Sequence, residues 1–231
     1  MSEHVKVIEC PRDAMQGIKQ FIPTDQKVQY IQSLLRVGFD TIDFGSFVSP
    51  KAIPQMTDTA EVLAQLDLSK TSSKLLTIVA NLRGAEAACQ HPEIDYLGYP
   101  FSISENFQMR NTHKTIAQSV LILQDILNLS HKHNKQVVVY ISMGFGNPYG
   151  DPYDTEYILQ IIQQLVGMGI RTISLADTVG VAAPSTIAYL FDALIPAFKE
   201  VRFGAHFHST WEGAEEKIAI ALKMQQDSAL N

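Results

Sequence analysis

Two histidines late in the chain, His206 and His208, have the spacing of metal ligands. They end a short run that reads as a β-strand, with Phe207 between them. Residues two apart in a strand project to the same face, so both imidazoles can reach one ion. The alternative is a purely structural pair, because neighbouring histidines in strands do not always bind metal. The pair predicts a metal site only if other polar groups gather around it.

A second pair with chemical potential, Arg12 and Asp13, lies near the start of the chain. One carboxylate and two neutral imidazoles without a nearby cysteine suit Mg²⁺, Mn²⁺ or Zn²⁺ in an open site. The permanent charge and fork geometry of Arg12 suit it to stabilise an oxyanion or enolate beside such an ion. The alternative is a local ion pair that follows a strand.

These residues are positioned by short β-branched runs that alternate with longer amphipathic segments. The predicted strands are residues 5–10, 41–44, 74–80, 94–99, 136–142, 172–176 and 202–206. The predicted helices are residues 25–37, 59–68, 83–89, 114–132, 154–166, 185–198 and 211–224. Such alternation is typical of an α/β chain with a parallel sheet.

We predict a (β/α)8 TIM barrel that forms a single catalytic domain over residues 1–231. An eighth strand begins at residues 227–230 in this interpretation, so the last loop and helix are expected to be absent from the sequence. Comparison of the helix ends at 34–43 and 165–174 also suggests that residues are missing after Met224. The alternative, a doubly wound open sheet, lacks a Gly-x-Gly-x-x-Gly motif after the first strand.

Polar residues recur at the predicted carboxyl ends of the strands, where TIM barrels place their active sites. They are Arg12, Asp13, Gln16, Asp43, Ser46, Asn81, Ser102, Ser104, Ser142, Ser174, Asp177, His206 and His208. We therefore expect one polar rim, although Asn81 and Ser142 can also be read as structural residues.

Composition limits the possible partners. The 231 residues carry a net charge of -6 and no run of Lys or Arg, which argues against nucleic acid and anionic membrane surfaces. With 46% hydrophobic residues the chain can bury one sizeable core, yet no apolar run is long enough to span a bilayer. Two cysteines, Cys10 and Cys89, and no leader segment indicate a reducing, cytoplasmic setting. A small molecule or another protein is the expected partner.

Several stretches together resemble the hydroxymethylglutaryl-CoA lyase family over essentially the whole chain. The most specific are Ser-Phe-Val-Ser-Pro-Lys at 46–51 and Pro-Gln-Met at 54–56. Related isopropylmalate and homocitrate synthases share the Arg-Asp and His-x-His elements but not, as a rule, these two. Residues 7–16, 42–45, 80–84, 174–180 and 206–208 complete the resemblance.

The resemblance implies metal-dependent retro-Claisen cleavage of 3-hydroxy-3-methylglutaryl-CoA to acetyl-CoA and acetoacetate, a step of leucine degradation. It also implies an acyl-CoA substrate, a divalent metal (Mg²⁺ or Mn²⁺ ahead of Zn²⁺) and a homodimer. The implied metal ligands are Asp13, His206 and His208, and the implied catalytic residues are Arg12 and Asp177. The implied substrate-binding residues are Gln16, Asp43, Ser46, Ser104 and Ser174.

The chain departs from the family pattern at three positions. Ala14 replaces a usual glycine, Asp43 a usual glutamate, and Ser209 a usual acidic or amide residue. The family's fourth ligand, an asparagine, and its catalytic cysteine follow the eighth strand and cannot be assigned here; Cys10 and Cys89 do not replace that cysteine. Two alternatives therefore stay open. One is an acyl-CoA lyase or synthase for a different 3-hydroxy acid, and the other is an inactive barrel that binds a ligand or partner.

Overall fold

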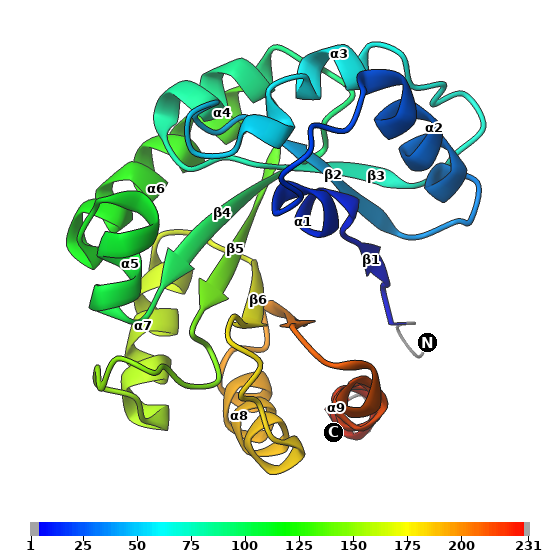
Figure 1. Ribbon diagram of the computed structural model, residues 1–231. Helices are drawn as coiled ribbons and strands as arrows, with labels where there is room; N and C mark the ends of the chain where they lie inside the picture. The colour runs from blue at the N-terminus through cyan, green and yellow to red at the C-terminus, as the bar shows by residue number, and fades with distance from the viewer. Residues whose placement is uncertain (1–4, 229–231) are drawn as a thin grey trace. The chain divides into compact units, whose positions relative to one another are not determined.

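The computed structural model describes residues 5–228 (Figure 1). These residues divide into two compact units. The N-terminal unit comprises residues 6–99 and 125–136. The C-terminal unit comprises residues 100–124 and 137–228, together with Val5. Three elements contribute residues to both units: strand β4 (Tyr96–Ser102), helix α6 (Ile116–Lys132) and strand β5 (Gln136–Ser142).

Parallel strands in sequence order form the centre of the N-terminal unit. The strands are β1 (Ile8–Glu9), β2 (Thr41–Ser46), β3 (Lys74–Ile78) and the first part of β4 (Tyr96–Ser102). The connecting helices are α1 (Pro11–Gln16), α2 (Thr24–Leu35), the 3-10 helix η1 (Pro54–Met56), α3 (Thr59–Leu63) and α4 (Leu82–Cys89). All six residues of β2 are buried, as expected for a strand covered on both faces.

The C-terminal unit repeats this plan. Its parallel strands β5 (Gln136–Ser142), β6 (Thr172–Asp177) and β7 (Arg202–Phe207) also pair in sequence order, with Ala176 opposite His206. The helices are α5 (Glu105–Thr112), α6 (Ile116–Lys132), α7 (Thr155–Gly167), α8 (Pro184–Ala197) and α9 (Trp211–Ser228). Among residues 5–228, no helix is long and apolar enough to cross a membrane.

The predicted alternation of strand and helix is confirmed, with two helices that the periodicity did not predict. Helix α1 has only six residues, too few to show a clear apolar face, and the eight residues of α5 include only two large apolar side chains, Phe107 and Met109. Their signals were local: Pro11 at the first turn of α1, and Ser104, whose hydroxyl accepts a hydrogen bond from the Phe107 amide. The predicted start of an eighth strand is wrong at Asp227 and Ser228, which continue α9; Ala229 and Leu230 lie outside the described residues.

A β-bulge in β2 lies beside one of the predicted site residues. The register of β2 against β3 shifts between Asp43 and Gly45. Gly45 packs so closely on Thr59 that an added Cβ would lie 2.5 Å from the Thr59 methyl group. Bulges reorient the side chains of the strand that carries them, so this one sets the direction of Asp43.

The buried side chain of Lys27 holds the segment between α1 and α2 in place. The ammonium group of Lys27, which is 2% exposed, pairs with Asp58 at 2.6 Å, donates to the Gln55 carbonyl, and lies 4.1 Å from the centre of the Phe21 ring. The Gln55 side chain hydrogen-bonds backbone groups of Ile18, Gln20 and Ile22. The chain that leaves α1 is therefore held at several points, which limits how α1 can move.

Replacing Gly84 by alanine should destabilise the protein. An added Cβ would lie 2.2 Å from the Phe47 carbonyl oxygen, a backbone atom that cannot rotate away. We expect Gly84→Ala to lower the free energy of unfolding by about 1–3 kcal/mol, as measured by urea denaturation. Gly167→Ala is the matched control because that helical glycine has nothing within 4 Å of the added Cβ, and it should be neutral or slightly stabilising. Equal effects of the two substitutions would contradict this packing argument.

Candidate metal and catalytic site

The guanidinium group of Arg12 is held on two sides by carboxylates. Its Nε lies 3.2 and 3.1 Å from the two carboxylate oxygens of Asp43, and Nη2 lies 2.5 Å from Oδ2. On the other side, Nη1 donates to Asp13 Oδ1 and Gln16 Oε1, both at 3.0 Å. The spacing along α1 explains part of this arrangement. Gln16 lies about one helical turn beyond both Arg12 and Asp13, so its side chain can reach them. Four predicted site residues thus form one cluster within the N-terminal unit.

Arg12 remains a cation in this cluster. Burial by itself lowers its pKa, but the charge and hydrogen bonds of Asp43, with the charge of Asp13, more than offset burial and raise the pKa. A guanidinium that is charged, buried and bound on two edges has little freedom to reorient. It can therefore present a fixed positive charge to an anionic group.

Cys10, directly before α1, is a poor nucleophile. Burial, followed by the negative charge of Asp43, raises the pKa of its thiol to about 12. Burial also raises the pKa of the Cys89 thiol. Nucleophilic catalysis uses a thiolate, and burial disfavours the thiolate at both cysteines.

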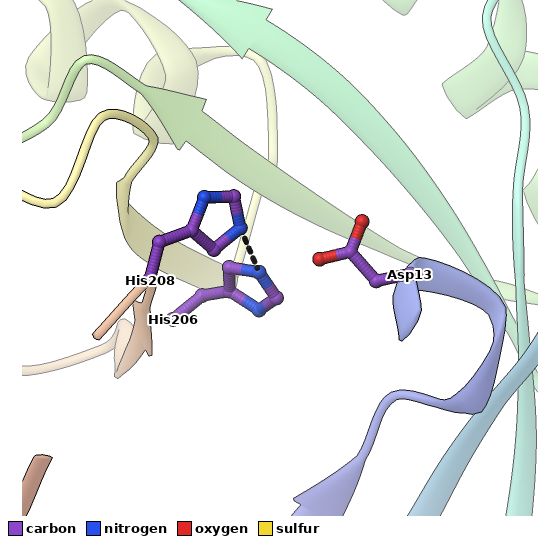
Figure 2. A group of neighbouring side chains, drawn as sticks. All are labelled: Asp13, His206 and His208. Carbon is purple, nitrogen blue, oxygen red and sulfur yellow. Dashed lines mark hydrogen bonds between the residues drawn. The ribbon is translucent and has the colours of Figure 1, made fainter. Parts of the chain in front are cut away.

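The two predicted histidine ligands lie together at the end of β7, as the sequence spacing predicts (Figure 2). Their Nε2 atoms are 3.2 Å apart, and the His208 Nδ1 lies 2.9 Å from the Thr178 carbonyl oxygen. Since a carbonyl only accepts, Nδ1 carries the proton and the lone pair of His208 lies on Nε2. Two nitrogens at this separation can both bind an ion at about 2.1 Å, so the pair fits a divalent metal.

Asp177, predicted to be catalytic, is buried and tightly engaged. It is 1% exposed; Oδ2 pairs with the ammonium group of Lys217 at 2.6 Å, and Oδ1 accepts a hydrogen bond from the Ala182 amide at 3.0 Å. Sequence reasoning missed Lys217. The sequence feature that could have found it is the spacing of Lys217 and Met224, which are seven residues apart and therefore share one face of α9. The structure buries both side chains.

The three predicted substrate-binding serines differ in their surroundings. The Ser46 hydroxyl is buried and has no hydrogen-bond partner among the described residues. Ser104 donates to Asp151 at 2.5 Å while it caps α5, and this hydrogen bond lowers the pKa of Asp151. Ser174 is buried on β6 opposite Gly204 of β7. Their role in binding substrate stays a prediction.

Comparison with known proteins gives a consistent set of relatives. The sequence profile of the HMGL-like family matches residues 6–224. The mitochondrial hydroxymethylglutaryl-CoA lyase of Arabidopsis thaliana is 30% identical over 221 residues, covering 95% of this chain and 47% of that protein. The 3-hydroxy-3-isohexenylglutaryl-CoA/hydroxymethylglutaryl-CoA lyase of Pseudomonas aeruginosa is 31% identical over 223 residues, covering 96% of this chain and 74% of that protein. The chain thus spans about half the length of the Arabidopsis relative.

A solved structure is similar as well. The lyase of Acinetobacter baumannii, determined with coenzyme A and 3-methylmalate, has a TM-score of 0.87 and 27% identity, covering 94% of this chain and 71% of that one. This likeness confirms the predicted fold class, a TIM barrel, with seven strands among residues 5–228.

The raised pKa of Cys10 predicts slow alkylation. In a Cys89→Ala variant at pH 8, we expect iodoacetamide to modify Cys10 at least about 100-fold more slowly in the folded protein than in urea, because little thiolate is present. Mass spectrometry of quenched samples measures both rates. Similar rates in the two states would show that the thiol is not suppressed by burial and by Asp43.

Proposed function

Because the chain belongs to the HMGL-like family, we propose that it cleaves a carbon–carbon bond in a 3-hydroxyacyl-CoA thioester. The proposed substrate is 3-hydroxy-3-methylglutaryl-CoA, which gives acetyl-CoA and acetoacetate. The observation that carries this proposal is the pair His206 and His208, whose Nε2 atoms lie 3.2 Å apart with one ring oriented by a backbone carbonyl. The related structure with coenzyme A supports a thioester substrate.

Asp13 is the proposed third ligand, with Mg²⁺ or Mn²⁺ preferred and Zn²⁺ as the alternative. The family resemblance supports this role, and within the N-terminal unit the Asp13 carboxylate is held by hydrogen bonds from Arg12 and Gln16. A carboxylate with two imidazoles suits these ions. A divalent ion held there would lower the pKa of the substrate hydroxyl that loses its proton before the bond breaks.

Arg12 is the proposed stabiliser of the departing enolate. When the substrate alkoxide collapses, negative charge develops on the thioester oxygen of the acetyl-CoA fragment. Asp43, Asp13 and Gln16 hold the Arg12 guanidinium before substrate binds, so no reorganisation is needed as that charge forms. Gln16 and Asp43 are therefore proposed to position the Arg12 guanidinium, in addition to the substrate contacts predicted for them.

Three serines and one aspartate complete the proposed site. The buried hydroxyl of Ser46 has hydrogen-bonding capacity that the described residues do not use, which supports a contact with substrate. Ser104 and Ser174 are proposed as further pocket residues, and Asp177 as the second catalytic residue. A single catalytic domain, a homodimer, a cytoplasmic setting and a place in leucine degradation belong to the same proposal.

A different acyl chain is the second candidate substrate. One relative, from Pseudomonas aeruginosa, is named for both 3-hydroxy-3-isohexenylglutaryl-CoA and hydroxymethylglutaryl-CoA. In this chain Asp43 and Ala14 flank Arg12 where the family resemblance implies glutamate and glycine. These changes surround the catalytic arginine, and they give a specific reason to test a longer 3-hydroxy acid.

The central test follows acetoacetate release from 3-hydroxy-3-methylglutaryl-CoA by the intact protein, with and without Mg²⁺ or Mn²⁺. We expect Arg12→Ala to lower kcat on the order of 10²-fold or more, because the developing enolate loses its fixed cation. His206→Ala should abolish the dependence on metal.

Arg36→Ala, at an exposed position of the same unit, is the matched control and should leave turnover unchanged. Near-normal turnover of Arg12→Ala would refute its assigned role. Release from the isohexenyl thioester alone would favour the second candidate. No release from either thioester would favour a barrel that binds without turnover.

A further inference from the structure

We propose that Lys217 is a positioning residue for the metal ligand His208, acting through Asp177 and the loop that follows β6. The proposal deepens the function proposed above and rests on it in one respect, that His208 binds the ion. Everything else in the argument lies within the C-terminal unit.

The Lys217 ammonium group joins three segments. It pairs with Asp177 Oδ2 at 2.6 Å at the end of β6, and it lies 3.5 Å from the carbonyl oxygen of His208, just beyond β7. Lys217 itself belongs to α9 and is 8% exposed, while Asp177 is 1% exposed. Buried charges are retained in a fold only when they are paired, so both side chains have essentially one arrangement.

The loop after β6 is fixed from the same carboxylate. Asp177 Oδ1 accepts a hydrogen bond from the Ala182 amide at 3.0 Å, and the Asp177 carbonyl accepts one from Gly180 at 3.2 Å. Gly180 has a φ of +74°, and an added Cβ would lie 3.2 Å from the His208 carbonyl oxygen. Glycine therefore lets this loop approach the end of β7.

Thr178 transmits this arrangement to the imidazole. Its hydroxyl accepts a hydrogen bond from the Met143 amide at 2.9 Å, and its carbonyl oxygen lies 2.9 Å from His208 Nδ1. The carbonyl therefore selects the tautomer of His208 with the proton on Nδ1 and directs Nε2 toward His206. Without Lys217, the Asp177 carboxylate that holds this loop would lose its own buried partner, and the Thr178 carbonyl that orients His208 would no longer be held in one place.

A purely stabilising role does not require a lysine here. A buried ion pair contributes little net stability compared with apolar residues of similar size. What the pair provides is a fixed relation between the end of β6, the start of α9 and the residue after β7. That relation determines the geometry of His208, so we expect the pair to affect metal binding more than folding.

The decisive variant is Lys217→Met combined with Asp177→Asn. The single change Lys217→Met leaves a buried carboxylate unpaired and can prevent folding. The double change removes both charges and retains an acceptor for the Ala182 amide. Lys217→Arg keeps the cation and should restore the wild-type behaviour. Lys223→Met makes the same substitution at an exposed position of α9 and is the matched control.

Two measurements on the intact protein separate this proposal from the proposed function. The first is long-range ¹H–¹⁵N correlation NMR of the histidine rings in metal-free protein, which reports the tautomer of His208 directly. The second is Mn²⁺ binding by calorimetry, with His206→Ala identifying the site. We expect the double variant to lose the Nδ1-protonated tautomer and to bind Mn²⁺ about 10–100-fold more weakly, with Lys223→Met unchanged.

A double variant that keeps both the tautomer and wild-type Mn²⁺ affinity would overturn the positioning role. If wild-type protein shows no His206-dependent Mn²⁺ binding, the proposed metal site fails. The NMR comparison still decides the positioning of His208 in that case, since it needs no metal: loss of the tautomer in the double variant supports it, and retention refutes it.

Discussion

The arrangement of the candidate site depends on the burial of one permanent charge, the guanidinium of Arg12. A guanidinium cannot be neutralised at any physiological pH, so burying it requires carboxylates on its hydrogen-bonding edges. Asp43 supplies one such edge from a fully buried strand, and Asp13 the other from α1. The bulge in β2 lies directly beside Asp43, and the chain that leaves α1 is anchored through Gln55.

Three of the four buried cations among the described residues organise the chain in the same way; the fourth, Lys135, donates to backbone carbonyls. Arg12, Lys27 and Lys217 are each paired with an aspartate from a distant part of the sequence: Asp43, Asp58 and Asp177. Such pairs add little net stability, but each permits only one relative placement of the elements it joins. The pairs of Arg12 with Asp43 and of Lys217 with Asp177 involve elements that carry proposed site residues, whereas the pair of Lys27 with Asp58 holds α2 to the segment before α3. The ion pairs therefore specify where functional side chains lie, while the apolar core supplies the stability.

The fold was largely predictable because its determinants are local. Alternating β-branched and amphipathic segments are visible in sequence windows of this length, and Gln136–Ser142 is both the predicted and the observed fifth strand. Helix α1 was not predicted because six residues show no clear periodicity, and α5 was not predicted because most of its residues are polar. The continuation of α9 through Asp227 and Ser228 was missed because an eighth strand was expected there from the plan of the barrel and not from a local β pattern.

The sequence by itself determined the fold class, the family resemblance and the pairing of His206 with His208, since a strand period of two residues decides that pairing. It also pointed to Arg12 and Asp13 by residue type. Only the tertiary structure decided which groups hold these residues. Asp43 hydrogen-bonds Arg12, the Thr178 carbonyl hydrogen-bonds His208, and Lys217 hydrogen-bonds Asp177. These partners are separated by 30 to 40 residues in the sequence. Contacts over such distances are set by strand register and helix packing, which no local pattern encodes.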